Sequence, residues 1–299
     1  MSRKRDFAKS TCPARRLPIE IFGSNPIENK IVESLDSNAS SEVFEIADIR
    51  GKITWINPGL LVKSLAKFKA KKSTGPDLLR PAIFPFLTPN IIEVLTVIYE
   101  CCISLEYTPL VWRDAKVIFI PKLGKNSYAE PKAFRPISLT NYFLKGLERL
   151  CCWSVESNLT ENPLHARQHG FLPCRSTETA ISEVTDEIEK FICNKKACLG
   201  VFLDIKSAFD SINPQHVHRA LIKFGADVRL AGWYRDYLLH RNLFFTLEGV
   251  TICVLIGVGF PQGGVVSVKF WLLAFDGAVQ IINSCNFKGT AFSDDCVTL

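Results

Sequence analysis

TAFSDDCVTL, residues 290–299, places two adjacent carboxylates, Asp294 and Asp295, between two short apolar runs. The order apolar, acidic, apolar predicts a tight β-hairpin with the acids at its turn. Two negative charges this close repel each other and raise each other's pKa. An ordinary turn or helix cap and a cation site are the two interpretations that compete for this pair, and the rest of the sequence must decide between them.

A third carboxylate stands at the end of another apolar run. CLGVFLD, residues 198–204, predicts a strand buried on both faces that ends at Asp204. If this strand neighbours the hairpin, three carboxylates converge on one sheet edge. Mg²⁺ prefers such oxygen ligands and keeps positions open for phosphate oxygens. Two of these ions about 4 Å apart promote in-line displacement at phosphorus, so the pattern predicts two Mg²⁺ ions, with Mn²⁺ as the substitute.

Composition excludes several classes of protein. The chain has 299 residues, 47% of them apolar and 11% aromatic, which is typical of a globular protein. No apolar run reaches the ~18 residues that cross a bilayer. The first 30 residues contain no apolar stretch typical of a secretory signal. Eleven cysteines occur without a CxxC pair, which argues against a zinc ribbon. They predict reduced side chains in an intracellular compartment, the nucleus or the cytoplasm.

The positive charge is clustered. The net charge is +6, with one basic cluster in residues 3–16 and another in residues 63–72 that contains no acid. The second cluster includes Lys67, Lys71 and Lys72, which predicts contacts with a nucleic-acid backbone. A solvated helix face is the alternative explanation.

Apolar spacing divides the chain into short elements. Helices are predicted from residue 58, over 90–105, within 135–159, over 178–192, over 214–224 and after residue 264; strands are predicted over 115–122, 198–204 and 243–260. The first helix is expected to end at the Gly-Pro pair in KSTGPD, residues 72–77. Residues 1–57 read as a basic and polar leader. The fold class predicted is α+β, with helices packed on one small antiparallel sheet.

Six blocks together decide between these interpretations. VIFIPKLGK, FRPISLT, QHGFLPCRST, VFLDIKSAFDSI, GFPQGGVVS and AFSDD follow one another in the order and spacing of the reverse transcriptases of non-LTR (LINE-type) retrotransposons. The sequence resembles this family from about residue 58 to residue 299. The resemblance implies a polymerase right hand, with fingers over 58–145 and palm over 146–299. The family's thumb and upstream endonuclease are expected to be missing from these residues.

The resemblance assigns metal ligands. It implies that Asp204 and Asp294 bind both ions, that Asp295 supports the pair and that the Ile205 carbonyl adds an oxygen. The reaction implied is RNA-directed DNA synthesis, with dNTPs as substrates, an RNA template and a DNA primer or target.

Further positions match the nucleotide site of the family. Phe209 corresponds to the aromatic residue under the sugar that blocks a 2′-OH, although its apolar helix also allows a core role. Lys122 and Arg135 flank the finger loop that grips the triphosphate. Arg135 could instead pair with Glu130. Asp210 is predicted to cap the helix that begins near Phe209 and to carry no chemistry.

The PQGG block and the QHG block complete the implied site. Gln262 matches the glutamine that contacts the incoming nucleotide. Gly263 and Gly264 would let the backbone approach the template–primer closely. Residues 168–170 are predicted to form a turn on the template side.

Two alternatives remain open from the sequence alone. An inactive remnant would bind nucleic acid without turnover, and the missing thumb favours it. An RNA-dependent RNA polymerase would keep the palm, but its ribonucleotide substrates need room at Phe209.

Overall fold

The computed structural model describes residues 53–285 and 287–299. The predicted leader, residues 1–57, therefore lies almost wholly outside the described residues. The elements are α3 (Pro58–Ala66), η1 (Pro81–Phe86), α4 (Pro89–Ser104), α5 (Leu110–Arg113), β1 (Asp114–Pro121), η2 (Pro131–Ala133), β2 (Phe134–Thr140), α6 (Tyr142–Asn158), α7 (Thr177–Cys193), β3 (Val201–Leu203), α8 (Ala208–Ser211), α9 (Pro214–Lys223), α10 (Val228–Leu239), β4 (Arg241–Leu247), β5 (Val250–Ile256), α11 (Ser267–Ser284), β6 (Gly289–Phe292) and β7 (Asp295–Thr298).

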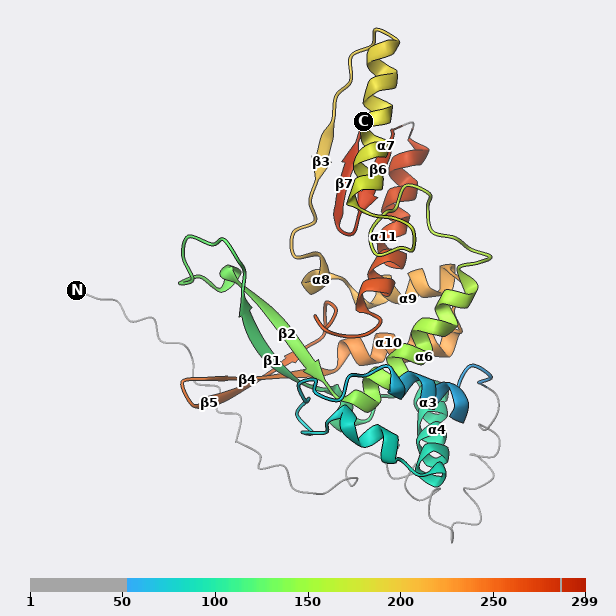
Figure 1. Cartoon of the computed structure of the whole chain (residues 1–299), viewed down its shortest axis with the longest axis vertical. Helices are drawn as coiled ribbons and strands as arrows, with labels where there is room; N and C mark the ends of the chain where they lie inside the picture. The colour runs from blue at the N-terminus through green and yellow to red at the C-terminus, as the bar shows by residue number, and fades with distance from the viewer. Residues whose placement is uncertain (1–52, 286) are drawn as a thin grey trace, which may run out of the picture.

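The described strands form two sheets rather than the single antiparallel sheet that was predicted. One sheet has the order β2-β1-β4-β5, in which β1 and β4 run parallel and the other neighbours run antiparallel. The other is antiparallel, with the order β3-β7-β6. Figure 1 shows the first sheet extending to the left of the molecule and the second standing at the top beside α7 and α11. The mixed α+β character holds.

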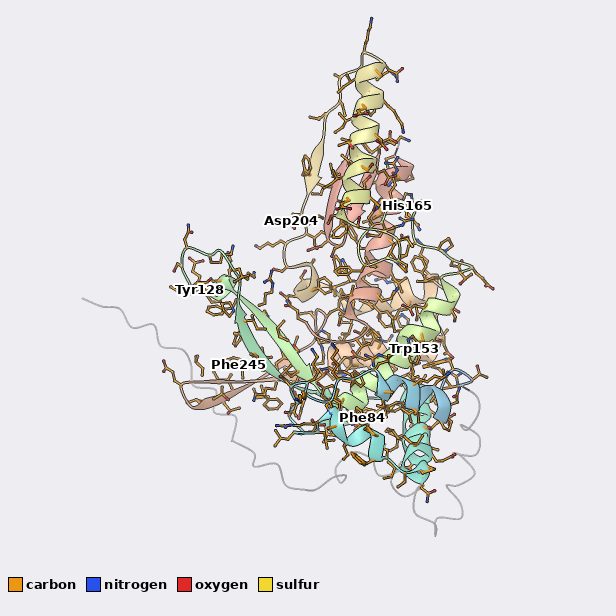
Figure 2. The ribbon with its side chains drawn as sticks, viewed as in Figure 1. Phe84, Tyr128, Trp153, His165, Asp204 and Phe245 are labelled. Carbon is orange, nitrogen blue, oxygen red and sulfur yellow. The ribbon has the colours of Figure 1, made fainter. Side chains whose placement is uncertain are left out.

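The helical core lies between the two sheets. Leu144, Leu147, Trp233, Tyr234 and Phe270, from α6, α10 and α11, are fully buried and belong to one hydrophobic cluster. Leu144 and Leu147 are three residues apart, which places them on one face of α6. In Figure 2 the side chains crowd around α6, α10 and α11, while Tyr128 and Phe245 lie out on the protruding hairpins. The buried side chains therefore hold α6, α10 and α11 together, and both sheets extend from this group of helices.

Capping signals set most helix boundaries. Asn213 accepts a hydrogen bond from the Gln215 N–H and Pro214 opens α9, as predicted. Pro89 likewise opens α4 behind Thr88. The first helix, α3, ends at Ala66 and not at the later Gly-Pro pair, because a turn with a hydrogen bond from Lys67 N–H to Ser64 closes it earlier.

Two elements of the structure were not predicted from the sequence. The segment 134–140 forms β2, not the approach to a helix, because its seven residues pair with β1 in a regular ladder. The sequence patterns did not predict helix α10, although Trp233, Tyr234 and Tyr237 bury their rings against the core.

Strand β3 differs most from the prediction. It was expected to be buried on both faces, yet Val201, Phe202 and Leu203 are all exposed, and Phe202 is 83% exposed. β3 is an edge strand in the described structure, paired only with β7, so its outer edge faces solvent.

Two other expectations meet the described structure here. The sheet β2-β1-β4-β5 joins residues 114–140 to residues 241–256, so it spans the predicted division at residue 145, and that division remains a prediction. None of the helices in the described part of the chain has the length and apolar character needed to span a membrane. No disulfide joins the cysteines of this part, and Cys101, Cys102, Cys151 and Cys296 are buried.

Candidate active site

The acidic hairpin, residues 289–298, forms as predicted. Phe292 pairs with Asp295, so Ser293 and Asp294 make the two-residue turn. Ser293 has a φ of 62°, the left-handed conformation that two-residue hairpin turns require. The indole N–H of Trp271, on α11, donates to the Ser293 carbonyl at 3.3 Å. The turn that carries the acids is thus tied to the core helix beneath it.

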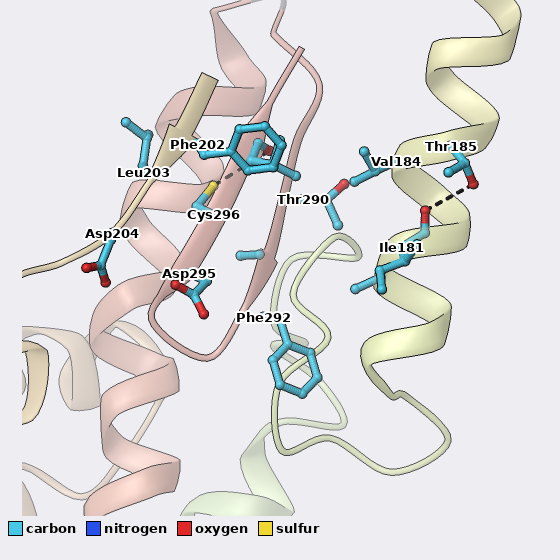
Figure 3. Close-up of a pocket in the computed structure, with 13 residues that line it drawn as sticks. Ile181, Val184, Thr185, Phe202, Leu203, Asp204, Thr290, Phe292, Asp295 and Cys296 are labelled. Atoms are coloured by element: carbon cyan, nitrogen blue, oxygen red, sulfur yellow. Dashed lines mark hydrogen bonds between the residues drawn. The ribbon is translucent and has the colours of Figure 1, made fainter. Parts of the chain in front are cut away.

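Strand pairing brings the third acid beside the hairpin. Leu203, the last residue of β3, pairs with Cys296, so Asp204, the next residue in the chain, comes beside Asp295, the first residue of β7. Figure 3 shows both carboxylates at the same end of the two strands. Burial, and then the negative charges of Asp294 and Asp204, raise the pKa of Asp295 above its ordinary value. Asp204 therefore interacts electrostatically with an acidic pair that begins 90 residues later in the chain.

This donor set suits a hard divalent cation. Carboxylate oxygens are what Mg²⁺ prefers, and a cation would relieve the charge repulsion that adds to burial in raising the pKa of Asp295. Yet among residues 53–285 and 287–299 no three His, Cys, Asp or Glu side chains are close enough together to hold a metal ion. The acids share one sheet end without forming a closed set of ligands. The Ile205 carbonyl accepts a hydrogen bond from the Ala208 N–H at 3.2 Å, which leaves its second lone pair for another partner.

An aromatic stack connects Phe209 to the acidic hairpin. The ring of Phe209, on the short helix α8, stacks on Trp271 with centroids 5.4 Å apart and an angle of 29°. Trp271 is the residue that donates to Ser293. Phe209 is half-buried and packs against the core, so one side of its ring has the core-packing role that the sequence analysis gave as an alternative.

The PQGG loop, residues 261–264, is held between α8 and β2. The Gln262 side-chain amide donates to Asp210 at 2.9 Å, and the Gln262 carbonyl accepts from the Ser138 N–H at 2.7 Å. Asp210 was expected to cap its helix; instead Ser207 occupies the N-cap position and Asp210 binds Gln262. The loop thus brings Gln262, a predicted nucleotide contact, next to α8, the short helix that also carries Phe209.

The two glycines of this loop serve close packing within the protein. Gly263 has a φ of 119°, and a Cβ there would lie 2.8 Å from the Ser138 carbonyl oxygen. A Cβ at Gly264 would lie 2.5 Å from Ser267 Oγ and 3.1 Å from Glu148 Oε1. Closeness to β2 and to buried side chains is sufficient reason for glycine here, whatever the loop contacts in a complex.

Glu148, on α6, holds the residue that follows the PQGG loop, a role that was not predicted from the sequence. Its Oε2 accepts from the Val265 N–H at 2.9 Å, while its Oε1 is buried without a hydrogen-bond partner. Burial raises the pKa of Glu148 to about 7, although the Val265 N–H and nearby cations oppose the rise. An acid between Leu144, Leu147 and Cys151, on the apolar face of α6, was the available signal.

The predicted triphosphate contacts lie at the far end of the β1–β2 hairpin. Lys122 follows β1 and its N–H donates to Ala133 O at 2.8 Å, while Arg135 pairs with Ile120. Arg135 is exposed, and in the described chain no ion pair joins it to Glu130. The two cations are brought near each other, but on a hairpin that projects away from the helical core (Figure 1).

The three predicted backbone contacts lie elsewhere. Lys67, Lys71 and Lys72 are all exposed at and beyond the end of α3. In Figure 1, α3 lies at the lower end of the molecule and the acidic hairpin at the upper end. These lysines therefore do not join the acids in one local site.

The predicted template-side turn faces the protein interior. The ring of His169 lies 2.9 Å from Thr179 Oγ1 and 2.7 Å from Glu183 Oε2, both on α7, and His169 is 7% exposed. Both ring nitrogens of His169 therefore contact side chains of α7, and the imidazole does not face solvent.

A cavity of about 470 Å³ adjoins the acids. It lies between α7 and the sheet β3-β7-β6 (Figure 3), and its lining includes Ile181, Phe202, Asp204, Phe292 and Asp295. Two apolar side chains of α7 border this space: Val184 lines it beside Ile181, which is 63% exposed.

Comparisons with known proteins converge on one family. The family model described as reverse transcriptase (RNA-dependent DNA polymerase) matches residues 120–299. A probable RNA-directed DNA polymerase from transposon BS of Drosophila melanogaster is 29% identical over 69% of this chain and 23% of its own length. The RNA-directed DNA polymerase from mobile element jockey of the same fly is 29% identical over 68% of this chain and 22% of its own.

A third relative spans nearly all of the sequence. The Pol polyprotein of a type-1 retrotransposable element R1 from Bradysia coprophila is 25% identical over 95% of this chain and 29% of its own length. The chain thus spans about a quarter of the length of these curated relatives. Among solved structures, an apo telomerase from Candida tropicalis truncated from its C-terminal domain is 14% identical, with a TM-score of 0.46 over 62% of this chain and 43% of that one.

Proposed function

Because the chain belongs to the reverse transcriptase (RNA-dependent DNA polymerase) family, we propose that it carries the nucleotidyl-transfer site of a non-LTR retrotransposon polymerase. The reaction joins the α-phosphate of a dNTP to a DNA 3′ hydroxyl and releases pyrophosphate. One observation carries the proposal. The β3–β7 register brings Asp204 beside Asp295 at the turn that holds Asp294. Burial, together with the charges of Asp294 and Asp204, raises the pKa of Asp295.

The acids are the part of the site that would hold metal. Asp204 and Asp294 would bind two Mg²⁺ ions, with Asp295 and the Ile205 carbonyl in support. When bound, such ions lower the pKa of the attacking hydroxyl and neutralise charge on the leaving group. The carboxylates themselves need no proton transfer; their role is to fix the reacting oxygens. A cation would also offset the repulsion among them.

The remaining residues would hold the dNTP. Phe209, kept in place by its stack on Trp271, would lie under the sugar and exclude a 2′-OH. Gln262, oriented by Asp210, would contact the nucleotide. Lys122 and Arg135 would contact the triphosphate, since guanidinium and ammonium groups suit phosphate oxygens.

Template and primer would bind through the positively charged surface. The proposed partners are an RNA template and a DNA primer or target, with Lys67, Lys71 and Lys72 contacting phosphates from the α3 end. Fingers over 58–145 and palm over 146–299 remain the proposed division.

Primer extension tests the proposal. The 299-residue chain is incubated with an RNA template, a DNA primer, dNTPs and Mg²⁺ or Mn²⁺, and extension is compared among wild type, Asp204→Ala and Asp294→Ala. Both variants should lose extension by at least about 10³-fold while circular dichroism stays unchanged. Asp186→Ala is the matched control, because Asp186 is an exposed acid on α7. Extension by Asp294→Ala at the wild-type rate would refute the assigned role.

An inactive nucleic-acid-binding remnant is the second candidate. The observation in its favour is that the described acids do not form a closed three-ligand set. Template–primer binding in a gel shift, without Mg²⁺- or Mn²⁺-dependent extension by the wild-type chain, would select it.

A further inference from the structure

The acidic hairpin is buttressed by a segment far from it in sequence. Residues 167–170, called here the histidine loop, run alongside β6. The Ala291 N–H donates to Arg167 O at 2.8 Å, and the His169 N–H donates to Ala291 O at 2.8 Å. Gln168 and Ala291 form a parallel β-bridge. The loop therefore extends the sheet at the edge that β6 would otherwise expose.

Contact between this loop and the turn is tight. A Cβ at Gly170 would lie 2.2 Å from Ser293 N and 2.8 Å from Ser293 Cα, which are backbone atoms that cannot swing aside. Ser293 immediately precedes Asp294. Any side chain at Gly170 must displace the turn that carries the acids or the loop itself.

Helix α7 holds the loop in turn. His169 contacts Thr179 Oγ1 and Glu183 Oε2 through its two ring nitrogens, at 2.9 and 2.7 Å. Arg167 pairs with Glu183 at 3.5 Å and with Glu187 at 2.9 Å. Since His169 is buried with both ring nitrogens paired, it is a fixed strut between α7 and the hairpin and not a surface ligand.

We propose that His169 and Gly170 are positioning residues for the acidic hairpin: His169 locks the histidine loop to α7, and Gly170 lets that loop press against the turn. This inference rests on the proposed function for its catalytic consequence, but its structural content concerns the hairpin alone. Loss of either residue should loosen the turn and lower kcat, while the Kd for template–primer stays unchanged.

Hydrogen exchange followed by mass spectrometry tests the proposal directly. In the 299-residue chain, His169→Ala and Gly170→Ala should each speed amide exchange in residues 289–298 by about tenfold or more, with residues 89–104 of α4 unchanged as the internal reference. His169→Gln should restore slow exchange in part, because its amide can donate to Glu183 as the ring Nε2 does. This rescue separates positioning from a general loss of packing.

His240→Ala is the matched control. His240 also contacts a carboxylate, with its Nδ1 2.9 Å from Asp236, but it is the exposed C-cap residue of α10. Its removal should leave exchange in 289–298 at the wild-type rate. If His169→Ala fails to fold, Glu183→Gln supplies the milder perturbation and should speed the same peptide by a smaller factor.

The outcomes separate this inference from the proposed function. Wild-type exchange in 289–298 for folded His169→Ala and Gly170→Ala overturns the positioning role. Asp294→Asn should abolish Mn²⁺ binding, followed by electron paramagnetic resonance, without speeding exchange. If Asp294→Asn still binds Mn²⁺ and extends primers while the His169 variants loosen the hairpin, the proposed function fails and the positioning inference stands.

Discussion

Replacing Glu148 by glutamine should stabilise the protein, and increasingly so as the pH rises. Glu148 is completely buried and its Oε1 has no hydrogen-bond partner in the described structure. The amide of Glu148→Gln keeps an oxygen to accept from the Val265 N–H, but it carries no charge to desolvate. The perturbation therefore removes the ionisation cost and keeps the anchor of the PQGG loop.

The size of the effect follows from the pKa of Glu148. Burial raises this pKa from 4.5 to about 7, a difference of about 2.5 pH units, and each unit corresponds to about 1.4 kcal/mol. Because the folded state holds the proton more tightly than the unfolded state, the penalty is absent below pH 4.5, grows between 4.5 and about 7, and is complete above. The variant should exceed the wild type in free energy of unfolding by about 1 kcal/mol at pH 5 and about 3 kcal/mol at pH 8.

Urea denaturation at pH 5, 6, 7 and 8, followed by circular dichroism, measures this difference. Comparing variant with wild type at each pH cancels the contributions of other titrating groups, such as Asp295. Glu189→Gln, an exposed acid on α7, is the control and should give a small difference that does not change with pH. A difference for Glu148→Gln that stays flat between pH 5 and 8, or a variant less stable than wild type at pH 8, would refute the reasoning.

Three further predictions concern the same site. Gly263→Ala should lower the free energy of unfolding by about 1–3 kcal/mol, because its Cβ meets the Ser138 carbonyl at a φ of 119°; a urea midpoint equal to wild type would contradict this. Phe209→Ala should raise kcat/KM for ribonucleotides relative to deoxynucleotides in primer extension, and an unchanged ratio would favour the RNA polymerase alternative. Mn²⁺ affinity should fall as the pH drops through the raised pKa of Asp295, because a protonated carboxyl is a poor ligand. Asp204→Asn should weaken Mn²⁺ binding, because it removes a proposed ligand, and should move that midpoint to lower pH. An identical midpoint in a Mn²⁺ titration would contradict the influence of the Asp204 charge on Asp295.

Local signals in the sequence predicted the elements that local forces stabilise. Proline at the first turn and a polar cap ahead of it mark α4 and α9, and the acidic hairpin follows from its turn and its flanking apolar residues. These patterns involve neighbours in the chain, so one sequence contains all the information needed.

Burial could not be predicted in the same way. VFL at 201–203 has the composition of an interior strand, but its exposure depends on which strands and helices surround it. The same limit applies to Glu148 and Asp210, whose roles arise from partners more than 50 residues away. The six sequence blocks identified the family, but not the contacts that join the blocks to one another.

These contacts hold the acidic hairpin by more interactions than they hold Asp204. The acidic hairpin is held by Trp271 from α11 and by the histidine loop from α7, so Asp294 and Asp295 sit on a braced turn. Asp204 is held beside them by three ladder positions of an exposed edge strand, with little apolar burial to stabilise the pairing. Repulsion among the acids opposes the pairing of β3 with β7. A cation bound between Asp204 and the hairpin would therefore stabilise the pairing that the protein's own contacts stabilise least.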